Sequence, residues 1–216
     1  LILVSARVAG GEQDEQGIGL FLLDPAESGV KRRVYPTADG LKACELYLDG
    51  AFVASERVLG EPGQAFDALR YQQGRAIAAQ CAEAVGAMEA TCELTLDYLK
   101  TRKQFGVAIG SFQVLQHRMV DMRAELDQAS SMAILAACVA DLPDSAERSR
   151  ALAAAKYITT RAGRFISEQC IQLHGGIGLT DEYLGSHYAK HLVMISHQFG
   201  DDDHHLQAFA RLMEAA

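Results

Sequence analysis

The fold of this chain is decided by the stretch Thr101-Arg102-Lys103-Gln104-Phe105-Gly106-Val107-Ala108-Ile109-Gly110-Ser111-Phe112-Gln113, which separates one long helical pattern from the next. Its glycines allow a tight turn and a close approach of the backbone to a ligand. Arg102 can grip a phosphate with its fork of donors, and Phe105 and Phe112 can stack on a flat ring. This combination is typical of a site for the adenosine diphosphate end of a dinucleotide.

The residues alone leave a second interpretation open. Arg102 and Lys103 also suit the C-terminus of an ordinary helix, with cations against the helix dipole and Gly106 as the cap. The downstream motif is Gln172-Leu173-His174-Gly175-Gly176-Ile177-Gly178. It can likewise be a simple glycine cap, or a turn whose bare backbone N–H groups face a pyrophosphate.

The two motifs, at this separation, resemble the C-terminal part of the acyl-CoA dehydrogenases, and the resemblance covers essentially the whole chain. In that flavoprotein family both motifs touch an FAD that is held mainly by a neighbouring subunit. The resemblance therefore implies FAD contacts for Arg102, Gln104, Phe105, Phe112, Gln113, Gln172, His174, Gly175 and Gly176. It also implies an acyl-CoA substrate, an electron-transfer flavoprotein as partner, and a homomeric or heteromeric oligomer, expected to be a tetramer, with the helices at its interface.

The reaction implied by the resemblance removes two hydrogens from neighbouring carbons of an acyl thioester. The flavin accepts hydride from the β-carbon while a carboxylate takes the α-proton. The family's usual base is a Glu in a turn before the last helix, and the corresponding turn here is Gln198-Phe199-Gly200-Asp201, which puts Phe199 at the Glu position. A second family position for the Glu falls near Ala76, also without a carboxylate. The catalytic base is therefore unknown from the sequence.

Three hypotheses follow from the missing Glu. A chain with the FAD motifs but no base is most similar to the small subunits of heteromeric acyl-CoA dehydrogenases, such as the pimeloyl-CoA and steroid side-chain enzymes, in which the other subunit supplies the base. Alternatively, Asp201 is a shorter substitute base in an active homo-oligomer, although Asp201-Asp202-Asp203 also suits a helix N-terminus. The third is a non-enzymatic interaction module that binds metal through His197, His204 and His205. For the favoured enzyme we expect no metal.

Composition restricts the class of protein. The 216 residues carry a net charge of -8 and no basic stripe, which argues against a nucleic-acid partner. No apolar run is long enough to cross a bilayer. Five cysteines without CxxC spacing predict reduced core thiols in a cytoplasmic protein: Cys44, Cys81, Cys92, Cys138 and Cys170. The chain opens on Leu1 rather than Met, so we expect a fragment whose missing part completes the flavin and acyl sites.

The hydrophobic periodicity predicts an α+β protein. Residues 1–60 are predicted to form the strands Leu1–Val8, Gly17–Leu23, Val30–Pro36 and Ala43–Val53. The resemblance implies that they are the C-terminal half of an antiparallel β domain, truncated at its N-terminus. Alternation predicts that Cys44, Leu46 and Leu48 lie on a buried face. The periodicity predicts an up-down helical bundle over residues 61–216, and the resemblance implies that this bundle contacts FAD and forms the oligomer. The apolar stripes of its three long helices run from Ile77 to Leu99, from Leu115 to Ala140 and from Leu152 to Phe165. Ser111 is the predicted N-cap of the second helix, and two shorter helices follow the third.

Overall fold

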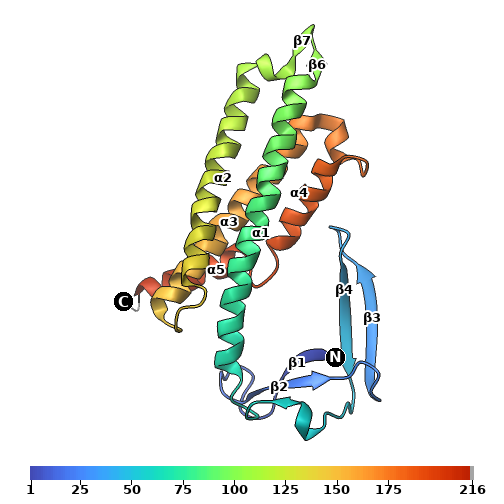
Figure 1. Ribbon diagram of the computed structural model, residues 1–216, viewed down its shortest axis with the longest axis vertical. Coiled ribbons are helices and arrows are strands. Elements are labelled where there is room, and N and C mark those ends of the chain that lie inside the picture. The colour runs from blue at the N-terminus through green and yellow to red at the C-terminus, as the bar shows by residue number, and fades with distance from the viewer. Residues whose placement is uncertain (215–216) are drawn as a thin grey trace. The chain divides into compact units, whose positions relative to one another are not determined.

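The computed structural model describes residues 1–214 and divides into two compact units, Leu1–Gln73 and a second unit that begins at Gly74. The division lies inside the first helix, α1 (Phe66–Thr101), so the helix that closes the first unit also opens the second. The prediction of strands followed by a helical bundle is confirmed (Figure 1).

The first unit consists of short antiparallel strands. They are β1 (Ile2–Arg7), β2 (Ile18–Leu23), β3 (Val30–Pro36), β4 (Lys42–Leu48) and β5 (Val58–Leu59). A three-stranded sheet has the order β1-β2-β5, while β3 and β4 form a separate ribbon in which Val30 is paired with Leu48. The predicted fourth strand is too long, because β4 ends at Leu48 rather than at Val53.

The expected buried face of β4 is wrong. Cys44 and Leu48 are exposed, and of the three predicted residues only Leu46 is partly buried. Within residues 1–214, β3 and β4 pair only with each other, so the ribbon has no third strand to extend it. The prediction that all five cysteines are core thiols is wrong for Cys44 on this strand and for Cys138 in the second unit, because both are exposed. The other three thiols are buried, and burial raises the pKa of Cys92 to about 11.

The second unit is a bundle of long helices joined by short turns. After α1 it contains α2 (Gln113–Val139), α3 (Ala146–His174), α4 (Leu184–Ile195) and α5 (Asp202–Glu214). The α1–α2 connection holds the hairpin strands β6 (Lys103–Gln104) and β7 (Val107–Ala108), followed by a 3-10 helix, Ile109–Ser111. Ser111 is not the N-cap of α2, because its hydroxyl donates a hydrogen bond to the Ala108 carbonyl at 2.7 Å and Phe112 occupies the cap position.

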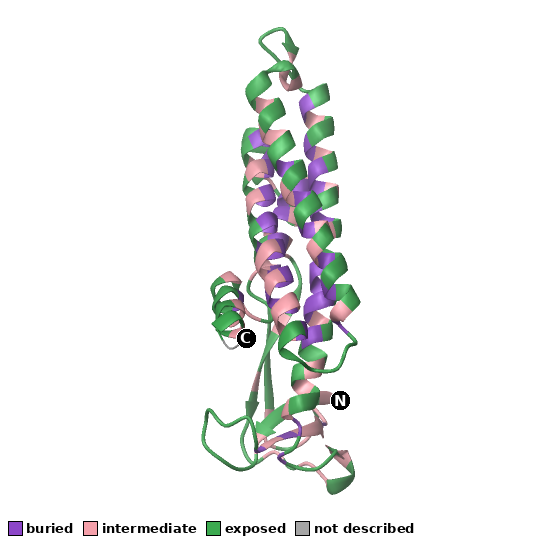
Figure 2. Cartoon of the chain, turned by 90° about the vertical axis from the view of Figure 1, so that its left-hand side faces the viewer, coloured by how far each residue is buried: buried purple, intermediate pink, exposed green. Residues whose placement is uncertain are grey.

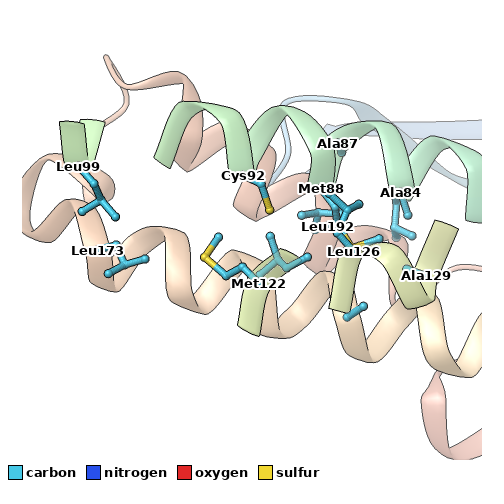
Figure 3. Packing of buried hydrophobic residues seen from close by; sticks show 13 residues of the cluster. Ala84, Ala87, Met88, Cys92, Leu99, Met122, Leu126, Ala129, Leu173 and Leu192 are labelled. Atoms are coloured by element: carbon cyan, nitrogen blue, oxygen red, sulfur yellow. The ribbon is translucent and has the colours of Figure 1, made fainter. Parts of the chain in front are cut away.

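The core of the bundle forms where the apolar stripes of the helices meet (Figure 2). Its larger cluster, shown in Figure 3, consists of Ala84, Ala87, Met88, Cys92, Leu99, Met122, Leu126, Ala129, Ala162, Ile166, Leu173, Leu192 and Ile195. A second cluster uses small residues of α2 and α3, such as Ala136 and Ala155, which allow close helix approach. Both clusters follow the predicted 3.6-residue period.

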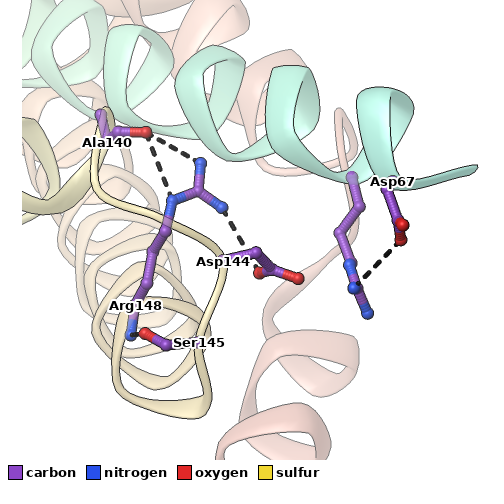
Figure 4. A network of polar contacts seen from close by, with 6 residues as sticks. Asp67, Ala140, Asp144, Ser145 and Arg148 are labelled. Atoms are coloured by element: carbon purple, nitrogen blue, oxygen red, sulfur yellow. Dashed lines mark hydrogen bonds and ion pairs between the residues drawn. The ribbon is translucent and has the colours of Figure 1, made fainter.

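The turn between α2 and α3 is fixed by a buried arginine (Figure 4). Arg148 donates to the Ala140 carbonyl through Nη2 at 2.8 Å and through Nε at 3.3 Å, and its Nη1 lies 3.9 Å from an Asp144 carboxylate oxygen. Its guanidinium also occupies the space beside Gly74, where an added Cβ would lie 2.3 Å from Nη2. Ser145 caps α3 by accepting the Arg148 N–H at 3.1 Å.

Candidate functional site

The hairpin between α1 and α2 holds an exposed phenylalanine in a strained conformation. The two-residue loop is Phe105-Gly106, and both φ angles are positive, 55° and 80°. This is the type I′ geometry that fits the twist of a hairpin, and Asn or Gly normally supplies its first position. A bulky residue in the left-handed region costs about 1–2 kcal/mol. The Phe105 side chain is 89% exposed, so packing within the described chain does not explain why Phe is present.

Phe112 lies next to this strained residue. The two rings meet edge to face, with centroids 6.0 Å apart and an interplanar angle of 81°. We call this pair of exposed rings, Phe105 and Phe112, the aromatic ledge. Phe112 also occupies the N-cap position of α2 without a side-chain cap, so the positive end of that helix dipole begins at Gln113 beside the ledge.

The hairpin also carries cationic charge. Arg102 is exposed, and its guanidinium makes no hydrogen bond or ion pair with the residues that the structure describes. Lys103 is exposed beside it. Gln104, in contrast, is partly engaged, because its side-chain Nε2 donates to the Lys103 carbonyl at 2.9 Å. A free guanidinium close to exposed rings has the chemistry to hold a phosphate group near a flat ring system.

The second motif forms the end of α3. The helix stops at His174, and Gly175 provides the cap with φ of 63° while its N–H bonds to the Ile171 carbonyl. Gln172, Gly175 and Gly176 are all exposed. Gly176 does not have a positive φ, and a Cβ added there would meet no atom within 4 Å. The fold of this chain therefore needs no glycine at Gly176, whereas a ligand in contact with the backbone would need one.

His174 turns its side chain into the bundle and is only 4% exposed. Nδ1 lies 2.8 Å from the Cys170 carbonyl, which can only accept, so Nδ1 carries the proton. Nε2 is then the acceptor for the Tyr183 hydroxyl at 2.6 Å. Burial lowers the pKa of His174, which is consistent with this neutral ring. Any contact of His174 with a cofactor must therefore come from its backbone.

The two motifs are brought together at one end of the bundle by Tyr98. Its ring centroid lies 4.5 Å from that of His174, and its hydroxyl donates to the His174 carbonyl at 3.3 Å. The Tyr98 carbonyl in turn accepts the Arg102 N–H at 2.8 Å. A second connection joins the start of α2 to α3, because Arg118 Nη1 donates to Gln169 Oε1 at 2.7 Å.

These bridging residues were not identified from the sequence. Tyr98 and His174 are 76 positions apart, and Arg118 and Gln169 are 51 apart. No local pattern indicates that such pairs meet. A weak signal exists for Tyr98, which is a polar-tipped aromatic near the end of an apolar stripe and so needs a hydrogen-bond partner if it is buried.

The turn before α5 presents an exposed phenylalanine and no free carboxylate. Phe199 has a φ of 56° and is exposed, and Gly200 follows with φ of 97°. The Asp201 carboxylate accepts the His204 N–H at 2.8 Å, which is an N-cap contact at the start of α5. Asp201 is therefore engaged in helix capping, and Phe199 rather than a carboxylate projects from the turn.

The histidines near this turn do not gather around a common point. Within residues 1–214, no group of three or more His, Cys, Asp or Glu side chains has a metal-binding arrangement. His205 is buried, and its Nε2 donates to the Phe199 carbonyl at 2.9 Å. The metal-binding module therefore lacks support from the geometry. None of the helices in the described residues has the length and apolar character to span a membrane.

Comparison with known proteins identifies the family. The model of the acyl-CoA dehydrogenase C-terminal domain matches residues 70–213. The probable acyl-CoA dehydrogenase YngJ of Bacillus subtilis is 36% identical over 188 residues, covering 84% of this chain and 48% of the relative. This chain therefore belongs to the acyl-CoA dehydrogenase family, as its motifs indicated. It spans about half the length of the curated relatives it matches.

Solved structures agree with this assignment. The structure of the Tcur3481-Tcur3483 steroid ACAD variant superimposes with a TM-score of 0.83 at 29% identity, covering 99% of this chain and 55% of that one. The FAD complex of PigA has a TM-score of 0.87 at 22% identity, covering 98% of this chain and 55% of that one, and shows a shared fold. The predicted fold is thus confirmed by independent comparisons.

Proposed function

We propose that this chain is part of an FAD-dependent acyl-CoA dehydrogenase, which converts an acyl-CoA thioester to its α,β-unsaturated form. The second unit would hold the FAD of a neighbouring subunit, and the complete protein would work as a tetramer. The observation that carries this proposal is the contact of Tyr98 with His174, because it joins the two motifs at one end of the bundle. A ligand spanning both motifs would then touch the ledge and the glycine turn together.

The residues at this end fit a flavin dinucleotide. The Arg102 guanidinium is free to bind a phosphate, and the aromatic ledge offers flat apolar surface for a ring system. Gly176 leaves its backbone open to close approach by the pyrophosphate. Gln113 and Gln172 are exposed and can supply amide hydrogen bonds. When bound, FAD supplies the hydride acceptor, while these side chains orient it and exclude water.

We further propose that the base comes from another subunit type. The turn that carries the family's usual Glu has Phe199 at that position, and the nearby Asp201 carboxylate caps α5. A heteromeric assembly accounts for the missing Glu, because a second chain can supply the carboxylate that takes the α-proton. The Tcur3481-Tcur3483 structure is named for two proteins and described as a steroid ACAD, which supports a similar heteromer and a steroid-derived thioester for this chain. A fatty-acyl thioester is the alternative substrate.

The same proposal implies an electron acceptor and a cellular compartment for the enzyme. We expect an electron-transfer flavoprotein to reoxidise the flavin. We also expect a cytoplasmic protein, because its five cysteines are free, which suits a reducing compartment.

The test uses the full-length protein that contains this chain, produced alone and together with a candidate large subunit. Flavin per protomer and its anaerobic bleaching by acyl-CoA are recorded for each preparation. We expect stable flavin and bleaching only in the paired preparation, and loss of flavin in Arg102→Gln. Arg123→Gln is the matched control, because Arg123 is an exposed arginine of α2 that pairs with Asp127 at 2.8 Å. Flavin held equally by Arg102→Gln would contradict the site, and bleaching of the lone chain would contradict the role of the partner.

A further inference from the structure

A lysine is buried in the bundle without a carboxylate partner. Lys156 of α3 is 1% exposed, and no Asp or Glu pairs with it among the described residues. Nζ donates to the Ile195 carbonyl at 2.8 Å and to the side-chain oxygen of Gln80. An uncompensated buried cation is expensive, so its retention calls for a reason beyond packing.

The C-terminal end of α4 takes the place of the missing anion. Ile195 is the last residue of α4, so its carbonyl belongs to the negative end of that helix dipole. The same carbonyl accepts the Gln198 N–H at 3.2 Å. Gln80 extends the contact, because its Nε2 donates to the Gln198 side-chain oxygen at 2.5 Å. Lys156 is therefore connected to Gln198 in two ways. The Ile195 carbonyl joins it to the Gln198 backbone N–H, and Gln80 joins it to the Gln198 side chain.

The other side of the turn is held by α5. His205 donates to the Phe199 carbonyl at 2.9 Å, and Phe199 itself is in the left-handed region with φ of 56°. Gly200 has φ of 97°, and a Cβ there would lie 2.6 Å from His204 Cδ2. A bulky residue keeps such a backbone conformation only when its surroundings over-determine it. In this turn, contacts from α1, α3, α4 and α5 fix the backbone conformation of Phe199.

The charge state of this centre is set by its neighbours. Cys81 of α1 is the buried titratable group that faces Lys156, and burial raises the pKa of this thiol, so it is neutral at pH 7. On α5, burial lowers the pKa of His205. Its hydrogen bond to the Phe199 carbonyl and the Asp201 charge act in the opposite direction, while His204 and Lys156 lower this pKa further. Burial also lowers the pKa of Lys156, to about 8, which leaves it mainly cationic at pH 7. The cation thus has the carbonyl and amide oxygens as its partners.

We propose that Lys156 is a positioning residue that fixes the turn Gln198–Gly200 through Gln80 and the Ile195 carbonyl, and thereby aims Phe199 at the acyl group of the substrate. The last clause rests on the proposed function, because the family's usual Glu, whose position Phe199 occupies, acts on the acyl thioester. Gln80 and Thr101 are 21 residues apart on α1, which corresponds to about 30 Å of helix. Lys156 therefore acts on substrate binding without acting on the FAD-contacting end.

The experiment compares Lys156→Met and Gln198→Ala, each in the full-length protein paired with its large subunit, with His197→Ala as the control. Gln198 and His197 are both exposed, so these two variants fold even if Lys156→Met does not. Hydrogen exchange of the segment 196–201, bound flavin, and KM and kcat for an acyl-CoA are measured. We expect exchange at least about tenfold faster and KM raised several-fold in both test variants, with flavin content and kcat kept and the control unchanged.

Unchanged exchange and KM in Gln198→Ala would overturn the proposal, as would an equal change in His197→Ala. Should the wild-type protein bind no flavin, the proposed function fails. The exchange data still decide whether Lys156 fixes the turn, so the two failures are distinguishable.

Discussion

Tyr98 and His174 are in ring contact at 4.5 Å, and the Tyr98 hydroxyl donates to the His174 carbonyl. This contact connects the end of α1 to the end of α3. One of the two motifs begins at Thr101, three residues after Tyr98, and the other includes His174. The stability of this contact therefore controls how precisely the proposed FAD surface is formed.

Removing the Tyr183 hydroxyl should weaken that contact. In Tyr183→Phe the buried Nε2 of His174 loses its donor at 2.6 Å, and an unsatisfied buried acceptor costs about 1–3 kcal/mol. We expect a free energy of unfolding lower by about 1 kcal/mol or more, together with weaker flavin retention. Denaturant titration measures the first effect. Tyr157→Phe is the matched control, because that hydroxyl makes no hydrogen bond within the described chain, and an equal loss there would contradict the role of Tyr183.

Acid should destabilise the second unit through its buried histidines. Burial lowers the folded-state pKa of His174 and of His205 below the ordinary value of 6.5. Between the lowered pKa and about 6.5 the unfolded chain binds more protons than the folded one, so stability falls as the pH drops through this window. We expect a smaller loss between pH 7 and 5 in His205→Gln, which keeps a donor for Phe199 but does not titrate. An identical loss in wild type and variant would contradict this assignment for His205.

Alkali should have the opposite effect through Lys156. Its folded-state pKa is about 8 against an ordinary 10.5, so the unfolded chain binds more protons between these values and stability rises with pH. The full difference corresponds to roughly 3 kcal/mol at 1.36 kcal/mol per pKa unit. The difference in unfolding free energy between wild type and Lys156→Met, followed from pH 7 to 10.5, isolates this contribution. A difference that does not change with pH would show that Lys156 titrates normally.

Gly176 tests whether a ligand approaches the end of α3. A Cβ at this position meets no atom within 4 Å and φ is not positive, so Gly176→Ala should leave stability unchanged or raise it by about 0.4–1 kcal/mol. Flavin binding should nevertheless weaken, because the added methyl group occupies the space in front of the backbone. Flavin dissociation constants and thermal unfolding are measured on the same samples. Full flavin affinity in the variant would exclude a close approach here.

The helices and first strands could be predicted because local periodicity determines them. The stripe from Ile77 to Leu99 is mostly buried, as its 3.6-residue period indicates, although Val85 is half-buried and Leu96 is exposed. The prediction of a buried face on β4 was wrong, as the exposed Cys44 shows. Alternation indicates which residues share a face of a strand, but it does not indicate whether another layer covers that face. Ser111 was misassigned as a cap because the 3-10 turn moves the start of α2 to Gln113.

Only part of the candidate site could be predicted from the sequence. Exposed ligand-type residues such as Arg102 and Phe105 were singled out because their chemistry is local. The inward orientation of the His174 side chain, and its partner Tyr98, depend on contacts between distant segments that leave no local pattern. The buried Lys156 was missed for a related reason, since a lysine on a helix normally predicts an exposed position.

The most direct test concerns the strain at Phe105. Asn-Gly is the preferred type I′ turn, so Phe105→Asn should leave the free energy of unfolding unchanged or raise it by up to about 1 kcal/mol. Leu142→Asn, an exposed residue of the α2–α3 turn, is the control.

The decisive measurement is the flavin dissociation constant of Phe105→Asn in the full-length assembly. The proposed FAD surface predicts binding about tenfold weaker than in wild type, the equivalent of about 1.4 kcal/mol of lost ring contact, with folding preserved. Flavin affinity equal to that of wild type and of Leu142→Asn would contradict the assignment of this hairpin to the cofactor.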